Sequence, residues 1–342
     1  MACFSTLSSG ATTNRKSKVM SLFSLRSYRP GRNRAPRRQR SLLLVCLVCG
    51  VLLASMPVWA QASQPEEPFE HPEHGSLAEV GAKLANPVSD VWALFTEFDL
   101  NFSDGDVNLG NPKIGGRMIF QPVMPIPLFG EAEEEWKLIT RPIIPVLFSQ
   151  PVPKGLDDFN HPAGVGDIQL PMLVSPPSGD WLLGVGPTWL FPSASRDAFG
   201  RDQWGVGPAA VVGYKTKNWT AGVFPQYTFG IGGWNDDDKP DASYLSMLYF
   251  FIYNLPDAWQ VGLNPTISYD HKAPANNRWN VPLGLIVAKT TRIGNLPVKF
   301  QLGVEYSVVS QDAFGQRAQI KLNVIPVIPS LIKKPLLGMF GG

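Results

Sequence analysis

The sequence is poor in cysteine, histidine and charge. Its 342 residues include four histidines and three cysteines, Cys3, Cys46 and Cys49. The chain beyond residue 49 therefore offers no disulfide, thiol nucleophile or cysteine-based metal site. Charged residues make up 17% of the chain and hydrophobic residues 44%, a balance that excludes a disordered chain. Glycine and proline, at 32 each, disfavour a helical bundle and favour β structure with many turns.

The first 62 residues have the layout of a secretory signal peptide. They hold ten basic residues and no acidic one, so residues 63–342 keep 20 basic against 28 acidic residues, a net charge of −8 that argues against a nucleic-acid partner. The basic stretch ends at Arg40, the apolar run Ser41–Ser55 follows, and small residues stand at Ala60 and Ala62. We predict cleavage after Ala62 or, as a second choice, after Ala60. The alternative is an uncleaved anchor, for which the run is short.

After residue 62 the sequence lacks any apolar run of the roughly 18–20 residues that a membrane-spanning helix needs. Instead, twelve segments between residues 91 and 327 alternate in polarity. The clearest is Val298–Val308, in which the even positions are apolar and the odd positions are polar or glycine. Successive side chains of a strand point to opposite faces, so each segment predicts a strand with one apolar and one polar face.

Two environments fit such strands. In a soluble sandwich the apolar faces form the core, whereas in an outer-membrane barrel they contact lipid and the polar faces line the lumen. The barrel is favoured because short connections alternate with longer polar ones, as a meander with short periplasmic turns requires. The strand count is even, which places both ends of the strand region on one side, and closure removes the sheet edges that lipid forbids.

Tryptophan positions favour the same choice, because five begin odd-numbered and two begin even-numbered predicted strands. In an up-and-down barrel these positions form two rims, and aromatic girdles are typical of the two membrane interfaces. We expect at one rim Trp92, Trp136, Trp181, Trp219 and Trp259, and at the other Trp204 and Trp279.

The predicted fold is therefore all-β, a transmembrane antiparallel up-and-down β-barrel of about 12 strands. It spans residues 91–327, after the signal peptide 1–62 and an acidic periplasmic N-terminal segment 63–90, and before a C-terminal tail 328–342. Prolines inside the predicted strands remove ladder hydrogen bonds, so we expect bulges or positions near the rims there. These prolines include Pro142, Pro187, Pro208, Pro265 and Pro282, and the form Gly-x-Gly-Pro recurs before two of them.

Several stretches are similar to those of one bacterial outer-membrane family. They are Asn86–Asp90, Gln121–Ile126, Trp136–Pro142, Gly164–Ile168 and the Gly-x-Gly-Pro strands. Proteins of this family are described as phenol-degradation meta-pathway proteins or as transporters, and some carry the label neuromedin U. The resemblance covers roughly residues 83–333. It implies a β-barrel and uptake of aromatic or other hydrophobic compounds, and it brings no catalytic residues with it.

The polar faces carry charged residues that we expect to line the lumen. The predicted basic residues are Arg117, Lys137, Arg141, Lys215, Lys289, Lys299, Arg317 and Lys321, and the acidic ones are Glu97, Asp99, Asp167, Asp270 and Glu305. Because the last strand closes against the first, Lys321 can face Glu97 or Asp99. Charges inside a barrel need partners or water. They either line a narrow water-filled pore that favours anions or pair into a plug of salt bridges.

The sequence thus predicts a passive channel or uptake protein for small molecules in the outer membrane of a Gram-negative-type bacterium. The alternative is a structural or interaction barrel with a closed, salt-bridged lumen. Neither His161 nor His271 stands in a predicted strand beside an inward serine, so no enzyme activity is expected. We expect no cofactor and no metal: Pro72 disfavours a helix that would align His71 with His74, and Asp236–Asp238 is interpreted as a solvated turn. The expected partners are outer-membrane lipid, the barrel-assembly machinery and a small-molecule solute, with no nucleic acid.

Overall fold

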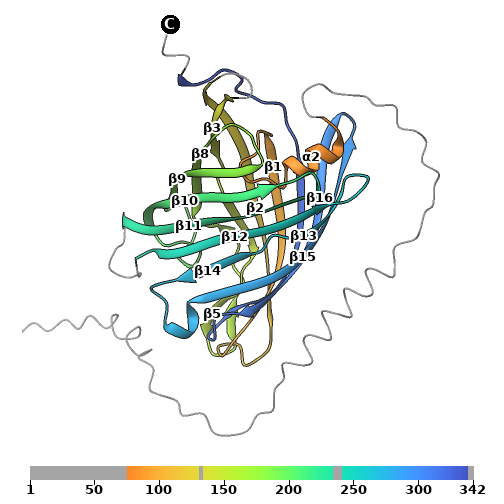
Figure 1. Ribbon diagram of the computed structural model, residues 1–342. Helices are drawn as coiled ribbons and strands as arrows, with labels where there is room; N and C mark the ends of the chain where they lie inside the picture. Colours follow the sequence, from red (N-terminus) through yellow and green to blue (C-terminus); the bar gives the residue numbers. More distant parts are fainter. Residues whose placement is uncertain (1–74, 131–133, 234–240, 338–342) are drawn as a thin grey trace, which may run out of the picture. The chain divides into compact units, whose positions relative to one another are not determined.

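In the computed structural model, residues 75–130, 134–233 and 241–337 form an antiparallel β-barrel (Figure 1). The predicted signal peptide, the three cysteines, His71, His74 and Asp236–Asp238 lie outside the described residues. No helix in the described ranges is long and apolar enough to cross a membrane.

The helix and the strands have these bounds: α2 Leu77–Lys83, β1 Ala93–Asp104, β2 Lys113–Phe129, β3 Trp136–Thr140, β4 Ile144–Ser149, β5 Val152–Gly155, β6 Asp158–Asn160, β7 Gly164–Val165, β8 Ile168–Ser175, β9 Trp181–Phe191, β10 Gln203–Lys215, β11 Trp219–Gly233, β12 Ser243–Asn254, β13 Trp259–Leu263, β14 Thr266–Asp270, β15 Trp279–Ile293, β16 Leu296–Val309 and β17 Gly315–Pro326. Short 3₁₀ turns stand at Asp197–Phe199 and Ala275–Asn277.

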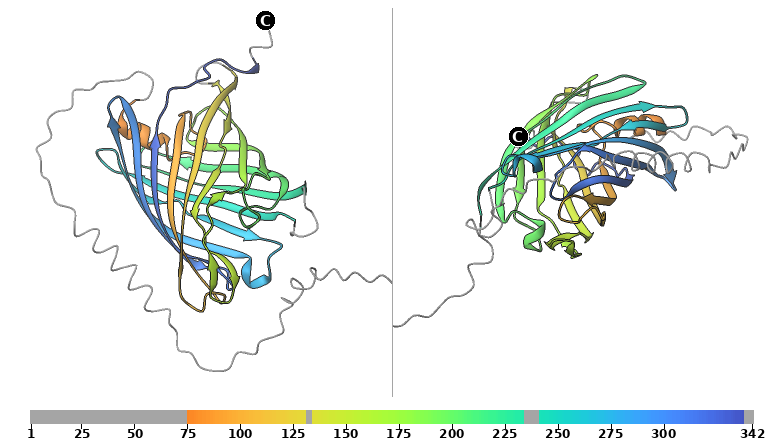
Figure 2. Two further views of the ribbon diagram at one scale, coloured as in Figure 1. Left: turned by 180° about the vertical axis from the view of Figure 1, so that it is seen from behind. Right: turned by 90° about the horizontal axis from the view of Figure 1, so that it is seen from below.

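The barrel is closed and has twelve antiparallel strands, as the alternation of the sequence predicted. Three of the twelve are each divided in two by a short break, namely β3–β4, β7–β8 and β13–β14. Neighbours in sequence are neighbours in the sheet, and β1 closes the barrel by pairing with both β2 and β17. Figures 1 and 2 show that β9–β12 run at a steep angle to β1, β16 and β17, so the sheet is strongly twisted.

The prolines lie either at interruptions of the strands, which are breaks or bulges, or in the middle of a strand. Pro142 and Pro265 stand at the breaks of β3–β4 and β13–β14, and Pro282 lies at a bulge. Pro187 and Pro208 are instead paired with each other in the middle of β9 and β10.

The glycines before Pro187 and Pro208 allow a close backbone approach. A Cβ on Gly186 would lie 2.0 Å from the carbonyl oxygen of Met172, and one on Gly207 would lie 1.8 Å from that of Tyr227. The Gly-Pro pairs therefore mark places where the neighbouring strand comes too near for any side chain.

The two faces of the wall differ as predicted. Along β16, Phe300 and Leu302 are 37% and 47% exposed, while Gln301 and Glu305 are 4% and 7% exposed and point inward. The same alternation runs along β10 and β17. The outer surface is consequently apolar and the interior mixed.

Aromatic rings gather outside at both ends of the barrel. At the end with short connections, Tyr214 contacts Trp181 and Trp219, and Trp136 stacks on Phe129. At the other end the ring pairs are Phe191 with Trp204 and Tyr269 with Trp279. Trp259 is also exposed on the outer face, at 39%.

The prediction for Trp92 is wrong. This ring is 4% exposed, and its indole nitrogen donates to the carbonyl of Pro125 at 3.0 Å. Trp92 also precedes β1 rather than opening it, and its own carbonyl accepts a hydrogen bond from Ile328 of the C-terminal segment. It is therefore held inside the protein and does not join an exposed girdle.

The chain before β1 lies inside the end of the barrel that bears the short connections. Helix α2 begins with a capping box between Ser76 and Glu79. Its residue Val80 and the following Leu84 pack with Ile325 in one buried cluster. Val88 joins a second cluster with inward side chains of β3, β8, β9, β10 and β11. Residues 77–91 therefore cross this mouth from one side of the wall to the other (Figure 1).

Candidate functional site

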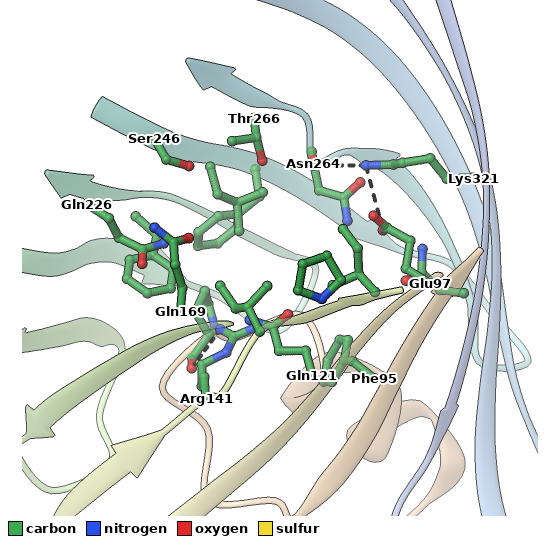
Figure 3. Close-up of a pocket in the computed structure, with 18 of the residues that line it drawn as sticks. Phe95, Glu97, Gln121, Arg141, Gln169, Gln226, Ser246, Asn264, Thr266 and Lys321 are labelled. Carbon is green, nitrogen blue, oxygen red and sulfur yellow. Dashed lines mark hydrogen bonds and ion pairs between the residues drawn. The ribbon is translucent and has the colours of Figure 1, made fainter. Parts of the chain in front are cut away.

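A cavity of about 750 Å³ occupies the barrel interior. Its lining includes Leu84 and Pro87 of the crossing segment at one end, and Phe199 and Arg201 of the long β9–β10 connection at the other. Between them it is lined by inward side chains from strands around the barrel, many of them amides and hydroxyls such as Gln169 and Ser246 (Figure 3). The cavity thus extends between the two ends of the barrel.

One part of the wall carries paired charges. Lys321 on β17 contacts Glu305 at 2.5 Å and Glu97 at 3.9 Å, and Figure 3 shows Lys321 beside Glu97 and Asn264. On the adjoining strands, Nε of Arg117 donates to Asp99 at 2.7 Å, and the Asp99 side chain is fully buried. This wall, formed by β1, β2, β16 and β17, is called the paired wall below.

Further charges are satisfied near the end with long connections. Arg201 contacts Asp270 at 2.6 Å. Asp167, in the break between β7 and β8, accepts hydrogen bonds from the backbone N–H groups of Ala194 and Arg201. These bonds fix the β9–β10 connection at the mouth of the cavity.

Arg141 has different surroundings. It follows β3 at the break before Pro142, and its side chain enters the cavity although the residue is only 6% exposed. Nη1 donates to the carbonyl of Pro87 at 3.2 Å, and the guanidinium carbon lies 5.8 Å and 5.7 Å from the ring centres of Phe95 and Phe224. Among the described residues no carboxylate is paired with it. Arg141 with these two rings is called the Arg141 corner.

Lys299 is a second cation without a partner in the described part of the chain. It is 2% exposed, lines the cavity, and lies on β16 between Thr290 and Ile325 of the neighbouring strands. Helix α2 contacts the same strand. Lys299 therefore stands near the crossing segment.

The structure brings seven of the predicted lumen residues to the cavity: Glu97, Arg117, Arg141, Asp167, Lys299, Glu305 and Lys321. Asp99 and Asp270 lie behind them as partners of lining arginines. Lys137 contacts Glu135 near the short-connection end, and Lys215 ends β10 on its inward face; neither lines the cavity.

Two lumen predictions are wrong. Lys289 lies on the outer face, where its cross-strand neighbours Trp259 and Phe300 are exposed; its amine sits over the Trp259 ring and donates to the carbonyl of Asp257. Arg317 is the extra residue of a bulge in the β1–β17 ladder, so Gln316 takes the place on the lining instead.

Sequence reasoning missed other lining residues, among them Lys83, Phe95, Arg201 and Phe224. For β12 the sequence did contain a signal, because the run from Leu248 to Tyr253 is apolar on both faces of the strand. Such a run indicates a strand covered on both sides. Here Phe250 packs in the cluster that contains Val88 of the crossing segment.

The described residues contain no group of three or more His, Cys, Asp or Glu side chains that could hold a metal ion. His161 is exposed. His271 is exposed too, and makes edge contacts with the rings of Tyr227 and Tyr269. Neither histidine lines the cavity.

No protein-family model matches the chain, and no curated protein matches its sequence. Among solved structures, it is similar to an outer-membrane channel from Pseudomonas putida F1, with a TM-score of 0.51 and 12% identity over 71% of this chain and 98% of that one. The chain has the fold of an outer-membrane β-barrel. Lower scores are found for the Pseudomonas putida toluene transporter TodX (TM-score 0.32, 11% identity, 72% of this chain and 92% of that one). The outer membrane phospholipase A from Escherichia coli matches with a TM-score of 0.36 and 13% identity, over 73% of this chain and 99% of that one.

Proposed function

We propose that this barrel is a passive channel through which small molecules cross a bacterial outer membrane. The observation that carries the proposal is the cavity, which extends between the two ends of a barrel whose outer surface is apolar. A closed barrel with an apolar exterior and a polar interior is the arrangement of outer-membrane channels. A twelve-stranded barrel is wider than a filled eight-stranded one and narrower than a porin, so small solutes are favoured.

The lining suggests which solutes pass. Six basic side chains line the cavity, and two of them, Arg141 and Lys299, have no carboxylate partner among the described residues, which favours anions near them. Phe95, Phe224 and Phe250 add aromatic surface to the same cavity. This mixture agrees with the aromatic or hydrophobic compounds that the family resemblance implies. Nothing in the cavity calls for chemical conversion of the solute.

Location and partners belong to the same proposal. The predicted signal peptide exports the chain, and the barrel-assembly machinery inserts it. The exposed rings of Trp136, Trp181, Trp204, Trp259 and Trp279 and the half-buried ring of Trp219 meet the lipid interfaces. The solute is a small molecule, and no nucleic acid is involved.

The experiment is single-channel recording in planar bilayers with the purified full chain. Ser246 lines the cavity from β12, so Ser246→Trp should reduce conductance by narrowing the lumen. Leu302 is 47% exposed on the outside, so Leu302→Trp, which adds the same side chain there, is the matched control and should conduct like the wild type. Equal conductance of all three proteins would place the current outside the lumen and contradict the proposal.

A structural barrel with a closed lumen is the second candidate. It is favoured by one observation, the crossing of the short-connection mouth by residues 77–91, where Val80 and Val88 are buried. On this alternative, neither conductance nor swelling of liposomes in small sugars or aromatic acids is observed. Both readouts are needed, because a channel for aromatic solutes can carry little ionic current.

A further inference from the structure

Part of the hydrogen-bonding capacity of Arg141 is unused. Within the described residues, its side chain makes one hydrogen bond, from Nη1 to the carbonyl of Pro87. Nε is buried and has no partner. Nε and Nη2 form one edge of the planar guanidinium, and this is the edge through which arginine binds a carboxylate by two parallel hydrogen bonds. Nε itself is covered by protein, whereas Nη2 has no hydrogen bond among the described residues and belongs to a side chain that lines the cavity. A donor without an acceptor is unfavourable, so Nη2 favours an acceptor from the cavity.

The charge of Arg141 is likewise unbalanced. Of the six basic side chains that line the cavity, four have carboxylate partners: Lys83 with Asp90, Arg117 with Asp99, Arg201 with Asp270, and Lys321 with Glu97 and Glu305. Arg141 and Lys299 have none in the described ranges. Because a buried charge needs an opposite one, the two cations favour an anionic ligand.

The aromatic rings narrow the class of anion. Phe95 and Phe224 lie on the guanidinium. Phe224 is 2% exposed, so it is the partly buried Phe95 that presents apolar surface to the cavity. Gln121 and Gln169 stand around Arg141 in Figure 3. A cavity of this volume with aromatic surface and a few converging polar groups is typical of small-ligand sites. An inorganic anion would leave the rings unused, and a neutral aromatic would leave the charge unbalanced.

We infer that the Arg141 corner binds a small aromatic carboxylate. The carboxylate accepts a hydrogen bond from Nη2 of Arg141, and the ring lies against Phe95. The inference deepens the proposed channel function and rests on it, since it names the solute class that the lumen selects. Lys299 also lines the cavity and adds positive charge to it.

The test measures binding of radiolabelled benzoate by equilibrium dialysis, with the full chain in detergent micelles. Wild type is expected to bind, and Arg141→Gln to lose about tenfold or more in affinity, which corresponds to one charge-assisted pair. Arg141→Lys, which keeps the charge without the planar edge, should recover only part of the affinity. Lys272→Gln, which removes an exposed cation outside the cavity, is the control and should stay within about twofold of wild type. Wild-type affinity in Arg141→Gln, or loss of binding in Lys272→Gln, overturns the inference.

Competition identifies the chemistry recognised. Acetate lacks the ring and benzyl alcohol lacks the charge, so each should displace benzoate at concentrations about tenfold or more above unlabelled benzoate. Equal potency of acetate would mean a plain anion site, and equal potency of benzyl alcohol a plain apolar pocket; either result overturns the inference. Phe95→Leu keeps the guanidinium and should weaken benzoate but not acetate. If Arg141→Gln does not fold, as judged by heat-modifiable migration on gels, the competition measurements and the Phe95→Leu variant test the inference instead.

Binding in micelles requires no conduction, so the two proposals can fail separately. Benzoate binding without conductance or swelling would contradict the channel and leave the site in place. Conductance without selective benzoate binding would leave the channel and remove the site.

Discussion

Buried charges in the lumen wall have two different kinds of surroundings. In the paired wall, Lys321 lies between Glu97 and Glu305, and Arg117 holds Asp99. In the Arg141 corner, a cation that is only 6% exposed has a backbone carbonyl and two phenylalanine rings but no carboxylate. Both regions face the same cavity.

The difference separates charges that are paired with carboxylates on neighbouring strands from a cation that has no carboxylate partner among the described residues. The contacts of Lys321 join β17 to β1 and β16, so they cross the seam where the barrel closes. Removing one member leaves the others buried and unpaired. Arg141 neutralises no carboxylate, and its loss leaves no charge behind. Mutations in the paired wall should therefore mainly lower stability, and mutations in the Arg141 corner should mainly change solute binding and conduction.

The largest stability effect is expected for Lys321→Met. The substitution leaves Glu97 and Glu305 without their cation, and breaking a buried pair costs about 3 kcal/mol or more. Urea titration of the protein in lipid vesicles, read by the heat-modifiable gel shift, measures the loss. The control is Lys289→Met, which removes a lysine from the outer face near a rim and should change the midpoint little. Equal midpoints for the two variants would mean that the paired wall does not hold the seam.

Arg141→Met should change the free energy of unfolding by no more than about 1 kcal/mol, since an uncompensated cation is replaced by an apolar side chain of similar length. The lost hydrogen bond to Pro87 and the removed desolvation cost act in opposite directions. The same urea titration measures it. A loss as large as that of Lys321→Met would show that Arg141 is a structural anchor and that the two regions do not differ.

The paired wall could be predicted from the sequence because it depends on regular strands. Alternation placed Lys321 and Glu97 on inward faces, and closure of the last strand on the first brought them together, as the structure shows. The fold was predictable for the same reason, since a period of two repeated over twelve segments specifies strands with two unlike faces.

The Arg141 corner could not be predicted in the same way, because it depends on interruptions. The break before Pro142 aims the guanidinium at the segment that crosses the mouth, and nothing in the alternation indicated that this segment lies inside. Bulges and strand ends also explain the errors. Arg317 is displaced by a bulge, and Lys289 follows the outer-face run of Leu285 and Val287.

A smaller effect is expected on ion selectivity. The proposed channel should favour anions near the uncompensated charge of Arg141, so Arg141→Glu should shift the anion-to-cation permeability ratio toward cations by about threefold. Reversal potentials in a salt gradient across a planar bilayer measure the ratio. Arg117→Glu is not a clean control, because it would leave Asp99 beside a second carboxylate. Lys272→Glu, on an exposed loop residue outside the cavity, is the suitable one. An unchanged ratio in Arg141→Glu would mean that this corner lies off the ion path.

The smallest effect is expected at an exposed pair, formed by Lys113 at the start of β2 and Asp157 in the long connection that contains β5 and β6. The hydrogen bond from Lys113, at 2.8 Å, lowers the pKa of Asp157 below its ordinary value of 3.8. Because the folded pKa is the lower one, the contribution of this pair is present above pH 3.8 and is lost as the pH falls through the folded pKa. Exposed pairs contribute little to overall stability, so only the local order of the hairpin should respond. Protection of the β5–β6 amides in hydrogen exchange should fall as the pH is lowered from above 3.8 through the folded pKa, after correction for the intrinsic exchange rates, while that of β16 stays constant. In Lys113→Met the β5–β6 protection should be low across the whole of this titration. A pH response that persists in Lys113→Met would mean that another group titrates. The pair of Lys113 and Asp157 could then not serve as the exposed comparison for the two buried regions.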